Sequence, residues 1–165
     1  MTGKAKRFPR VVPEIRKLCT DDADDLAQLL SDPLVMKYLE PPFTKGKAES
    51  FLIHEGLCET PRIYAAVIGD TFLGYVIYHA YDSGSMEIGW VLKKEYWHKG
   101  YASSLCEQLI QNAFHEKKDA VIECTKDHAV TIHIAQKYHF QYQGESGQLL
   151  TWRLPRCTER NCEHV

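Results

Sequence analysis

The stretch that decides the fold is MEIGWVLKKEYWHKGYASSLCEQLIQNAF, residues 86–114. Its first part has the composition of a β-strand, and Gly100 then marks a turn before a long amphipathic helix. The helix is predicted because apolar residues recur at the i, i+3, i+4, i+7 spacing that buries one helical stripe. The stripe consists of Ala102, Leu105, Cys106, Leu109, Ile110, Ala113 and Phe114. We therefore expect a strand, a glycine turn and a helix in succession.

The turn at Gly100 is a candidate anion site. The first backbone N–H groups of a helix lack intrahelical partners and attract negative charge. His98, Lys99 and the pair Lys93 and Lys94 add positive charge at the same end. This arrangement predicts a pocket for a phosphate-bearing ligand, with a phosphate contact favoured for Lys99. For Lys93 and Lys94, a phosphate contact and a solvated basic surface both stay open.

Length and composition predict one soluble globular domain. The chain has 165 residues, of which 44% are hydrophobic and 25% charged, and its formal net charge is −2. This charge gives no argument for a nucleic-acid partner, for which a basic face is expected. No apolar run approaches the roughly 20 residues that span a bilayer, so no membrane association is expected. The basic start MTGKAKRFPR lacks a following apolar segment, which favours a cytoplasmic protein over a secreted one.

We expect a flexible N-terminal arm at residues 1–12, one domain at 13–155 and a C-terminal tail at 156–165. Cys106 and Cys124 lie in apolar patterns that indicate buried thiols. Without a secretory signal, a disulfide framework is not expected. Cys157, Cys162 and His164 cluster in the tail, but a closed zinc site normally needs four ligands at tighter spacing. No metal site is predicted.

The segment after the first strand is predicted to be helical. Thr20, Asp21 and Asp22 offer N-cap oxygens for a helix that runs through Leu30, and Thr44 is expected to cap another at about 45–58. The first strand is expected within 14–19, and a short helix between the two others at 34–39. This region should shape the substrate mouth, with Tyr38, Glu40 and Phe43 as candidate contacts.

Three strands follow, at 62–68, 71–81 and 85–92. The pair Gly69-Asp70 predicts a two-residue hairpin turn between the first two. The second strand is apolar on both faces, which favours a central position in the sheet. Strict alternation places Phe72, Val76 and Tyr78 on one face and Leu73, Tyr75 and Ile77 on the other. In the third strand, Gly89 predicts a bulge or the close approach of another backbone.

After the long helix, a short strand is expected at 120–124. The connection is long enough for a parallel, right-handed crossover. A helix at 128–138 and a closing hairpin at 140–145 and 148–154, turning at Gly147, complete the chain.

This order of elements, together with three motifs, resembles the GNAT superfamily of N-acetyltransferases. Within it, the motifs are similar to those of the subgroup that acetylates ribosomal-protein N-termini. The motifs are Glu87-Ile88-Gly89-Trp90, the stretch from Tyr96 to Ala102, and the stretch from Thr131 to Phe140. The resemblance extends over about 14–154. It implies an α/β (α+β) fold with a mixed, mostly antiparallel six- to seven-stranded sheet, flanked by helices, and a parallel crossover at the cofactor site.

The resemblance also implies acetyl-CoA as the co-substrate. Its pyrophosphate would lie at the start of the long helix, and backbone groups near residues 90–92 would polarise the thioester carbonyl. The implied cofactor-binding residues are Trp90, Val91, Leu92, His98, Lys99, Gly100, Tyr101, Ala102, Ser103 and His128.

The reaction needs a group that removes a proton from the amine. Glu87 is the first candidate for this base, and His79 is the second because an imidazole titrates near neutral pH. For both, a purely structural role stays open. Thr131 is a candidate hydrogen-bond partner of the leaving thiol, or a helix cap.

The implied function is acetyl transfer to a primary amine by direct attack in a ternary complex. A cysteine acyl-enzyme is not expected, because Cys106 lies on the buried stripe. An alternative is a non-catalytic acyl-CoA-binding sensor or regulatory module. It is motivated by His128 at a position where the family has Asn, by His139 in place of Gly, and by the lack of a tyrosine near Ala135. The acceptor can be a small-molecule or peptide amine, and the protein a monomer or homodimer.

Overall fold

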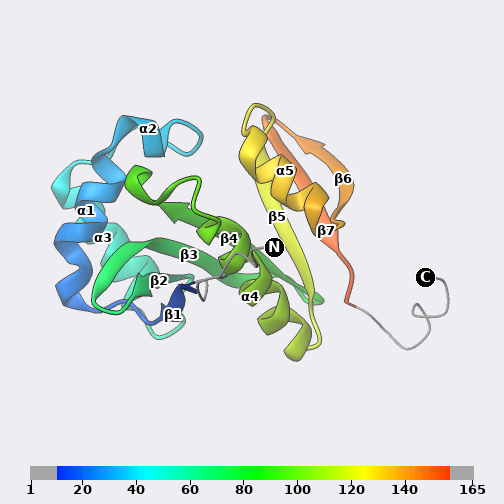
Figure 1. Cartoon of the computed structure of the whole chain (residues 1–165), viewed down its shortest axis with the longest axis horizontal. Coiled ribbons are helices and arrows are strands. Elements are labelled where there is room, and N and C mark those ends of the chain that lie inside the picture. The colour runs from blue at the N-terminus through cyan, green and yellow to red at the C-terminus, as the bar shows by residue number, and fades with distance from the viewer. Residues whose placement is uncertain (1–10, 157–165) are drawn as a thin grey trace, which may run out of the picture.

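The computed structural model describes residues 11–156, in which seven strands form one sheet flanked by helices (Figure 1). The strands are β1 (Glu14–Arg16), β2 (Ile63–Ile68), β3 (Thr71–Asp82), β4 (Ser85–Leu92), β5 (Asp119–Thr125), β6 (Gln141–Ser146) and β7 (Leu149–Leu154). The helices are α1 (Ala23–Ser31), α2 (Pro33–Met36), α3 (Lys45–Phe51), α4 (Tyr101–His115) and α5 (Ala129–Lys137). Single helical turns form η1 (Thr20–Asp22), η2 (Leu52–Gly56) and η3 (Lys94–Tyr96).

The sheet has the order β1-β2-β3-β4-β5-β7-β6. Its neighbouring strands pair antiparallel, except for β4 and β5, which pair in parallel through residues 85–87 and 119–121. Helix α4 makes the crossover between these two strands, as a parallel connection requires. The predicted fold class, a mostly antiparallel sheet with one parallel crossover, is therefore confirmed.

Beyond their short contact, β4 and β5 run apart (Figure 1). Residues 88–92 of β4 stay paired with β3, but none of them pairs with β5 among the described residues. Backbone N–H and C=O groups on that side of β4 are consequently without a strand partner. The sheet opens here into two diverging halves.

Helices cover both faces of the sheet. Helices α1 and α3 share one core with β2 and β3, and α4 and α5 share a second core with β4 and β5. The predicted stripe of α4 is buried at Leu105, Cys106, Leu109, Ile110 and Ala113. The core under α4 and α5 therefore contains residues from both halves of the opened sheet.

A β-bulge changes the predicted faces of β3. Leu73 has no partner on β2, because the residues on either side of it pair with successive residues of that strand. Phe72 consequently lies in the core of α1 and α3 with Tyr75, and Leu73 lies in the core of α4 with Val76. The expected grouping of Phe72 with Val76 is wrong, since one extra residue shifts the two-residue alternation.

The close backbone contact predicted at Gly89 occurs instead at Gly74. A Cβ atom on Gly74 would lie 2.0 Å from the Val91 carbonyl oxygen, which leaves no room for a side chain. A Cβ atom on Gly89 would lie 3.1 Å from a side-chain carbon of Ile77, and the strand ladder is regular there. Gly74 therefore lets β3 approach β4 next to the point where the sheet opens.

The helical segment before β2 departs from prediction at the start of α1 and at the ends of the two following helices. Asp22, one of the three predicted capping residues, is the N-cap of α1, but its side chain does not bond to the helix. The Asp22 carboxylate instead accepts hydrogen bonds from the Cys19 N–H at 2.8 Å and from the Arg16 guanidinium at 2.8 Å. The Thr44 hydroxyl caps α3 as predicted, accepting from the Lys47 N–H at 3.2 Å. The short helix ends at residue 36 rather than 39, and the third becomes a π-helical turn after residue 51.

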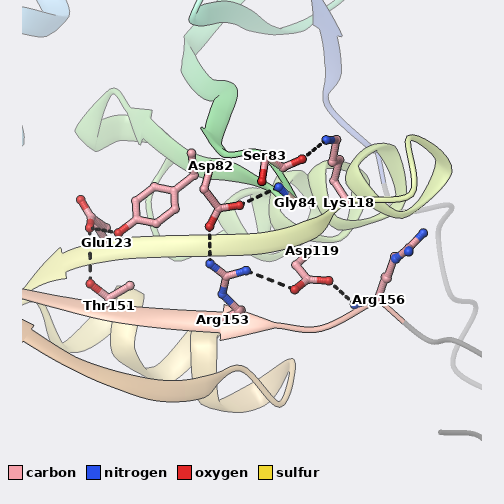
Figure 2. Close-up of polar contacts among 10 residues, drawn as sticks. Asp82, Ser83, Gly84, Lys118, Asp119, Glu123, Thr151, Arg153 and Arg156 are labelled. Atoms are coloured by element: carbon pink, nitrogen blue, oxygen red, sulfur yellow. Dashed lines mark hydrogen bonds and ion pairs between the residues drawn. The ribbon is translucent and has the colours of Figure 1, made fainter. Parts of the chain in front are cut away.

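Polar contacts close the joined end of the two halves (Figure 2). The Arg153 guanidinium donates to Asp82 at 2.7 Å and to Asp119 at 3.2 Å. It thereby ties β7 to the end of β3 and to the start of β5. Lys118 also donates to the Ser83 carbonyl oxygen in the β3–β4 turn. The Arg153 guanidinium holds the pKa of Asp82 well below its usual range, so this contact persists in mildly acidic solution.

The predicted N-terminal arm and C-terminal tail lie almost wholly outside the described residues, as do Cys157, Cys162 and His164. Within residues 11–156, no helix is both long and apolar enough to cross a bilayer.

We expect Gly74→Ala to lower the free energy of unfolding by about 2 kcal/mol or more, because the new methyl group meets backbone rather than a movable side chain. Urea denaturation at neutral pH measures this change.

Gly46→Ala is the matched control. Gly46 lies in α3, and a Cβ atom there would have no neighbour within 4 Å apart from the helix's own backbone. Alanine at this position should therefore leave stability unchanged or raise it slightly. Equal effects of the two substitutions would contradict the close approach of β3 and β4.

Candidate active site

Two pockets adjoin at the opening between β4 and β5. The apolar pocket has a volume of about 480 Å³ and lies between the end of β4 and the starts of α4 and α5. The acidic pocket has a volume of about 420 Å³ and lies between the α2–α3 region and strands β3, β4 and β5. Both pockets are lined by Tyr38, Leu39, Trp90 and His128. A ligand in one pocket can therefore meet a ligand in the other at these residues.

The loop before α4 is shaped by residues with positive φ. Gly100, at the N-cap of α4, has φ 82° and ψ 4°, a left-handed conformation that glycine adopts readily. His98 also has a positive φ, of 59°. The Trp97 indole N–H donates to the Leu92 carbonyl oxygen at 2.9 Å, which fixes the loop to the end of β4. The first N–H groups of α4 consequently face the apolar pocket with no intrahelical partner.

The structure gathers nine of the ten predicted cofactor-binding residues around the apolar pocket. They are Trp90, Val91, Leu92, His98, Gly100, Tyr101, Ala102, Ser103 and His128. Lys99 does not line this pocket; its ammonium group lies 5.6 Å from the centre of the Tyr96 ring. The loop brings its backbone, rather than the Lys99 side chain, to the pocket wall.

Lys93 and Lys94, which precede this loop, each have an acidic partner. Lys93 is buried and donates to Asp25 at 2.5 Å and to Gln28 at 3.0 Å on α1. Lys94 pairs with Asp32 at 3.0 Å. Both lysines therefore pair with carboxylates on or next to α1, rather than forming the solvated basic surface that was one of the two alternatives.

Lys137 supplies a cation at the start of α4 from the far end of α5. Its ammonium group donates to the Ser103 hydroxyl at 3.3 Å, and the neighbouring Tyr138 hydroxyl donates to the Ser103 carbonyl at 3.0 Å. Helix α5 is thus fixed to α4, with a positive charge beside the exposed N–H groups.

Glu87 and His79, the two candidate bases, face each other in the acidic pocket. They are directly paired across β4 and β3, and the Glu87 Oε2 to His79 Nε2 distance is 3.3 Å. His79 Nδ1 lies 3.0 Å from the Ala80 carbonyl oxygen, which only accepts, so the ring proton resides on Nδ1. Arg62 donates to His79 Nε2 at 3.2 Å. Nε2 of His79 is therefore close to both the Glu87 carboxylate and the Arg62 guanidinium.

The environment makes Glu87 more basic than an ordinary glutamate. Burial raises the pKa of its carboxyl group. The neighbouring His79 opposes this shift, the negative charge of Glu123 adds to it, and the positive charge of Arg62 opposes it, leaving a net raised pKa. A more basic carboxylate accepts a proton from an ammonium group more readily.

His128 joins the two halves of the opened sheet at the boundary of the pockets. Its ring stacks on that of Tyr38, with centroids 4.4 Å apart and an interplanar angle of 15°. His128 Nδ1 lies 3.2 Å from the Thr131 hydroxyl oxygen, and Thr131 is buried against the acidic pocket. Burial lowers the pKa of His128, so its imidazole is neutral near pH 7 and can donate one N–H.

The α2–α3 region lines the acidic pocket as predicted, with Tyr38, Glu40 and Phe43 on its wall. Three further charged residues, Glu55, Arg62 and Glu123, were not among the predicted site residues. Glu123 carried a detectable signal, because it is the one charged residue within the apolar run 120–124. Arg62 is brought in by the pairing of β2 with β3, which has no local signature in the sequence. Residues 11–156 contain no group of His, Cys, Asp or Glu side chains arranged to hold a metal ion.

Comparison with known proteins agrees with this geometry. Residues 14–141 match the acetyltransferase (GNAT) domain family. The chain is 24% identical over 136 residues to YnaD, an uncharacterised N-acetyltransferase of Bacillus subtilis, and the match covers 79% of each chain.

Two solved structures share the fold. A GNAT-family acetyltransferase from Bacillus anthracis has a TM-score of 0.74 and 22% identity, covering 87% of this chain and 95% of that one. RimL, a ribosomal L7/L12 α-N-protein acetyltransferase solved with coenzyme A, has a TM-score of 0.73 and 15% identity, covering 88% and 94%. With the family match spanning most of the domain, the chain belongs to the GNAT acetyltransferase family and is an acetyl-CoA-dependent N-acetyltransferase.

Proposed function

We propose that this enzyme transfers the acetyl group directly to a primary amine, with both substrates bound at once. The observation that supports this most strongly is the junction of the two pockets at Trp90 and His128. The apolar pocket would hold acetyl-CoA and the acidic pocket the amine. Positioning two reactants in contact supplies a large part of the rate enhancement in such a reaction.

The residues around the apolar pocket fit acetyl-CoA. Its pyrophosphate suits the exposed N–H groups at the start of α4, where the Lys137 ammonium adds a positive charge. The amides of its pantetheine arm suit the edge of β4 that β5 leaves unpaired. When bound there, acetyl-CoA supplies the acetyl group and leaves as the thiol of CoA.

Glu87 is the proposed base. The acceptor amine must lose a proton before it has a lone pair with which to attack, and the Glu87 carboxylate accepts that proton. His79 contacts the carboxylate at 3.3 Å, and Arg62 contacts His79 in turn at 3.2 Å. Glu87 and His79 therefore act as one pair rather than as alternatives.

Thr131 and His128 are proposed to hydrogen-bond groups at the junction. The neutral His128 ring can donate one N–H, and the Thr131 hydroxyl can turn toward the leaving sulfur. Neither the neutral imidazole of His128 nor the hydroxyl of Thr131 is a strong enough acid at neutral pH to be assigned as the proton donor to the thiolate, so we assign both residues binding roles.

The buried cysteines support direct transfer. Burial raises the pKa of the Cys106 thiol to about 12, and it also raises the pKa of Cys124, which lines the acidic pocket. Both remain thiols at neutral pH, whereas an acyl-enzyme requires a thiolate. Because the pocket that Glu87 lines adjoins the cofactor pocket, the alternative of a non-catalytic acyl-CoA-binding module is not favoured.

The motifs around Glu87 and Gly100, together with the fold shared with RimL, support a place in the ribosomal-protein N-acetyltransferase-like subgroup. The proposed acceptor is a small-molecule or peptide amine. A cytoplasmic monomer or homodimer is consistent with this proposal.

Glu87→Gln should lower kcat/KM by about 10²- to 10⁴-fold, because a positioned base contributes on that order. In the wild type, kcat/KM should fall as pH decreases through the raised pKa of Glu87, which lies above the ordinary value of 4.5, because the protonated carboxyl cannot accept a proton. The variant should lose this acidic limb. Thiol release from acetyl-CoA, followed across pH, measures both effects.

Two amines of different basicity distinguish Glu87 from the substrate, because a limb caused by the amine moves with the amine's own pKa. Glu145→Gln is the matched control, since Glu145 lies on β6 and pairs with Lys126 at 2.8 Å. An acidic limb that persists unchanged in Glu87→Gln would remove Glu87 as the base.

Gly100→Ala should weaken CoA binding by about 5- to 30-fold, because the free loop of the variant relaxes out of the left-handed conformation and must regain it, at about 1–2 kcal/mol, to present its N–H groups to CoA. Titration calorimetry with CoA measures this change.

Gly69→Ala is the matched control for backbone strain. Gly69 has φ 56° in the β2–β3 turn, and a Cβ atom there would have no neighbour within 4 Å. Alanine should therefore reduce stability through backbone strain alone, without changing CoA affinity. Unchanged CoA affinity in Gly100→Ala would show that the loop does not hold the cofactor.

A further inference from the structure

One carboxylate in the acidic pocket has no cationic partner. The pocket is lined by four glutamates, of which Glu40 pairs with Lys47 at 2.7 Å, Glu55 with Arg62 at 3.5 Å, and Glu87 with His79 at 3.3 Å. Glu123, the fourth, takes part in none of the ion pairs among the described residues. Its charge is thus available to a ligand.

Glu123 is nevertheless held in a defined position (Figure 2). The Tyr81 hydroxyl donates to Glu123 Oε1 at 2.9 Å, and the Thr151 hydroxyl donates to the same oxygen at 3.3 Å. Both contacts engage one carboxylate oxygen, so Oε2 keeps its full capacity to accept from a ligand. Such a fixed carboxylate loses little conformational freedom when a cation binds to it.

The same wall carries another unsatisfied oxygen. Thr125 lies two residues beyond Glu123 on β5 and also lines the acidic pocket. Its hydroxyl oxygen is buried and has no hydrogen-bond partner among the described residues. Buried polar atoms in folded proteins normally have partners, so this hydroxyl is a second polar group on the wall that a ligand or a water can satisfy.

Glu123 lies at a set position relative to the proposed base. Glu87 pairs with Val121, and Glu123 follows Val121 by two residues, so it lies on the same face about 6.6 Å further along the strand. The charge of Glu123 also raises the pKa of Glu87, which places the two carboxylates within electrostatic range. A ligand can therefore contact both with groups a few bonds apart.

The charged residues on the wall of the acidic pocket disfavour binding of an acceptor that carries a carboxylate. Arg62 is the one arginine on the pocket wall, and it already contacts Glu55 and His79. An acceptor carboxylate would have to displace these partners and approach Glu123 with like charge.

We propose that Glu123 binds a second cationic group of the acceptor, so that the enzyme selects short primary amines carrying two positive charges. This assignment rests on the proposed function, in which the acidic pocket holds the reacting amine. One ammonium group approaches Glu87 and loses its proton there, and the other stays protonated on Glu123 Oε2. Tyr81 and Thr151 are positioning residues, because they act on the acceptor only through Glu123.

The test compares 1,4-diaminobutane with butylamine, which has the same chain and one charge. For the wild type, kcat/KM should be at least about tenfold higher for the diamine, the ratio expected from one charged hydrogen bond. In Glu123→Gln this preference should disappear. Tyr81→Phe should reduce it partially, and Glu145→Gln, an exposed glutamate outside both pockets, should leave it intact.

A second readout is independent of the diamine. Removing the Glu123 charge should lower the pKa of Glu87, so the acidic limb of the pH profile with butylamine should move to lower pH in Glu123→Gln. This shift reports that the Glu123 charge faces Glu87 across the pocket, whereas the loss of the diamine preference reports its contact with the acceptor. Should Glu123→Gln fail to fold, Tyr81→Phe and Thr151→Val test the same contact.

An equal preference for the diamine in the wild type and Glu123→Gln would overturn the proposal. So would wild-type acetylation of butylamine or a neutral peptide amine at least as efficiently as the diamine. The absence of thiol release with every amine would instead refute the proposed function, which separates the two failures.

Discussion

The short parallel contact between β4 and β5 is the constraint on which the rest of the structure depends. It joins only residues 85–87 with residues 119–121, and Arg153 holds it closed through Asp82 and Asp119. Because the strands are fixed at one end and unpaired at the other, the sheet opens at a definite place. A longer ladder would close the cofactor pocket, and a lost contact would separate the two halves that carry the acetyl donor and the base.

Burial and charge cooperate in the acidic pocket. Burial alone favours a protonated Glu87, and His79 and Arg62 partly restore its anionic form. The outcome is a carboxylate that is more basic than one in water. Glu123 contributes twice in this scheme, by raising that basicity and by offering a site for positive charge. A single electrostatic arrangement thus links acceptor recognition to proton transfer.

Much of this fold could be predicted from local sequence patterns. The bounds of β4, the buried stripe of α4 and the glycine turn at Gly100 follow from periodicity and composition, which are local properties. The bulge at Leu73 could not be predicted, because both faces of β3 are apolar and the pattern does not specify its register. The stack of Tyr38 on His128 and the contact of Lys93 with Asp25 join residues far apart in the chain. Such pairs depend on tertiary packing, which no single segment encodes.

The two pockets differ in what they are made of. The site for the acetyl donor uses a helix start and a strand edge, which are main-chain features that many sequences can provide. The acceptor site uses side chains from several strands and the α2–α3 region. Substitutions there can alter the choice of amine while the backbone that holds the cofactor stays intact. The architecture therefore allows acceptor specificity to evolve separately from cofactor use, so that a conserved donor chemistry can serve new substrates.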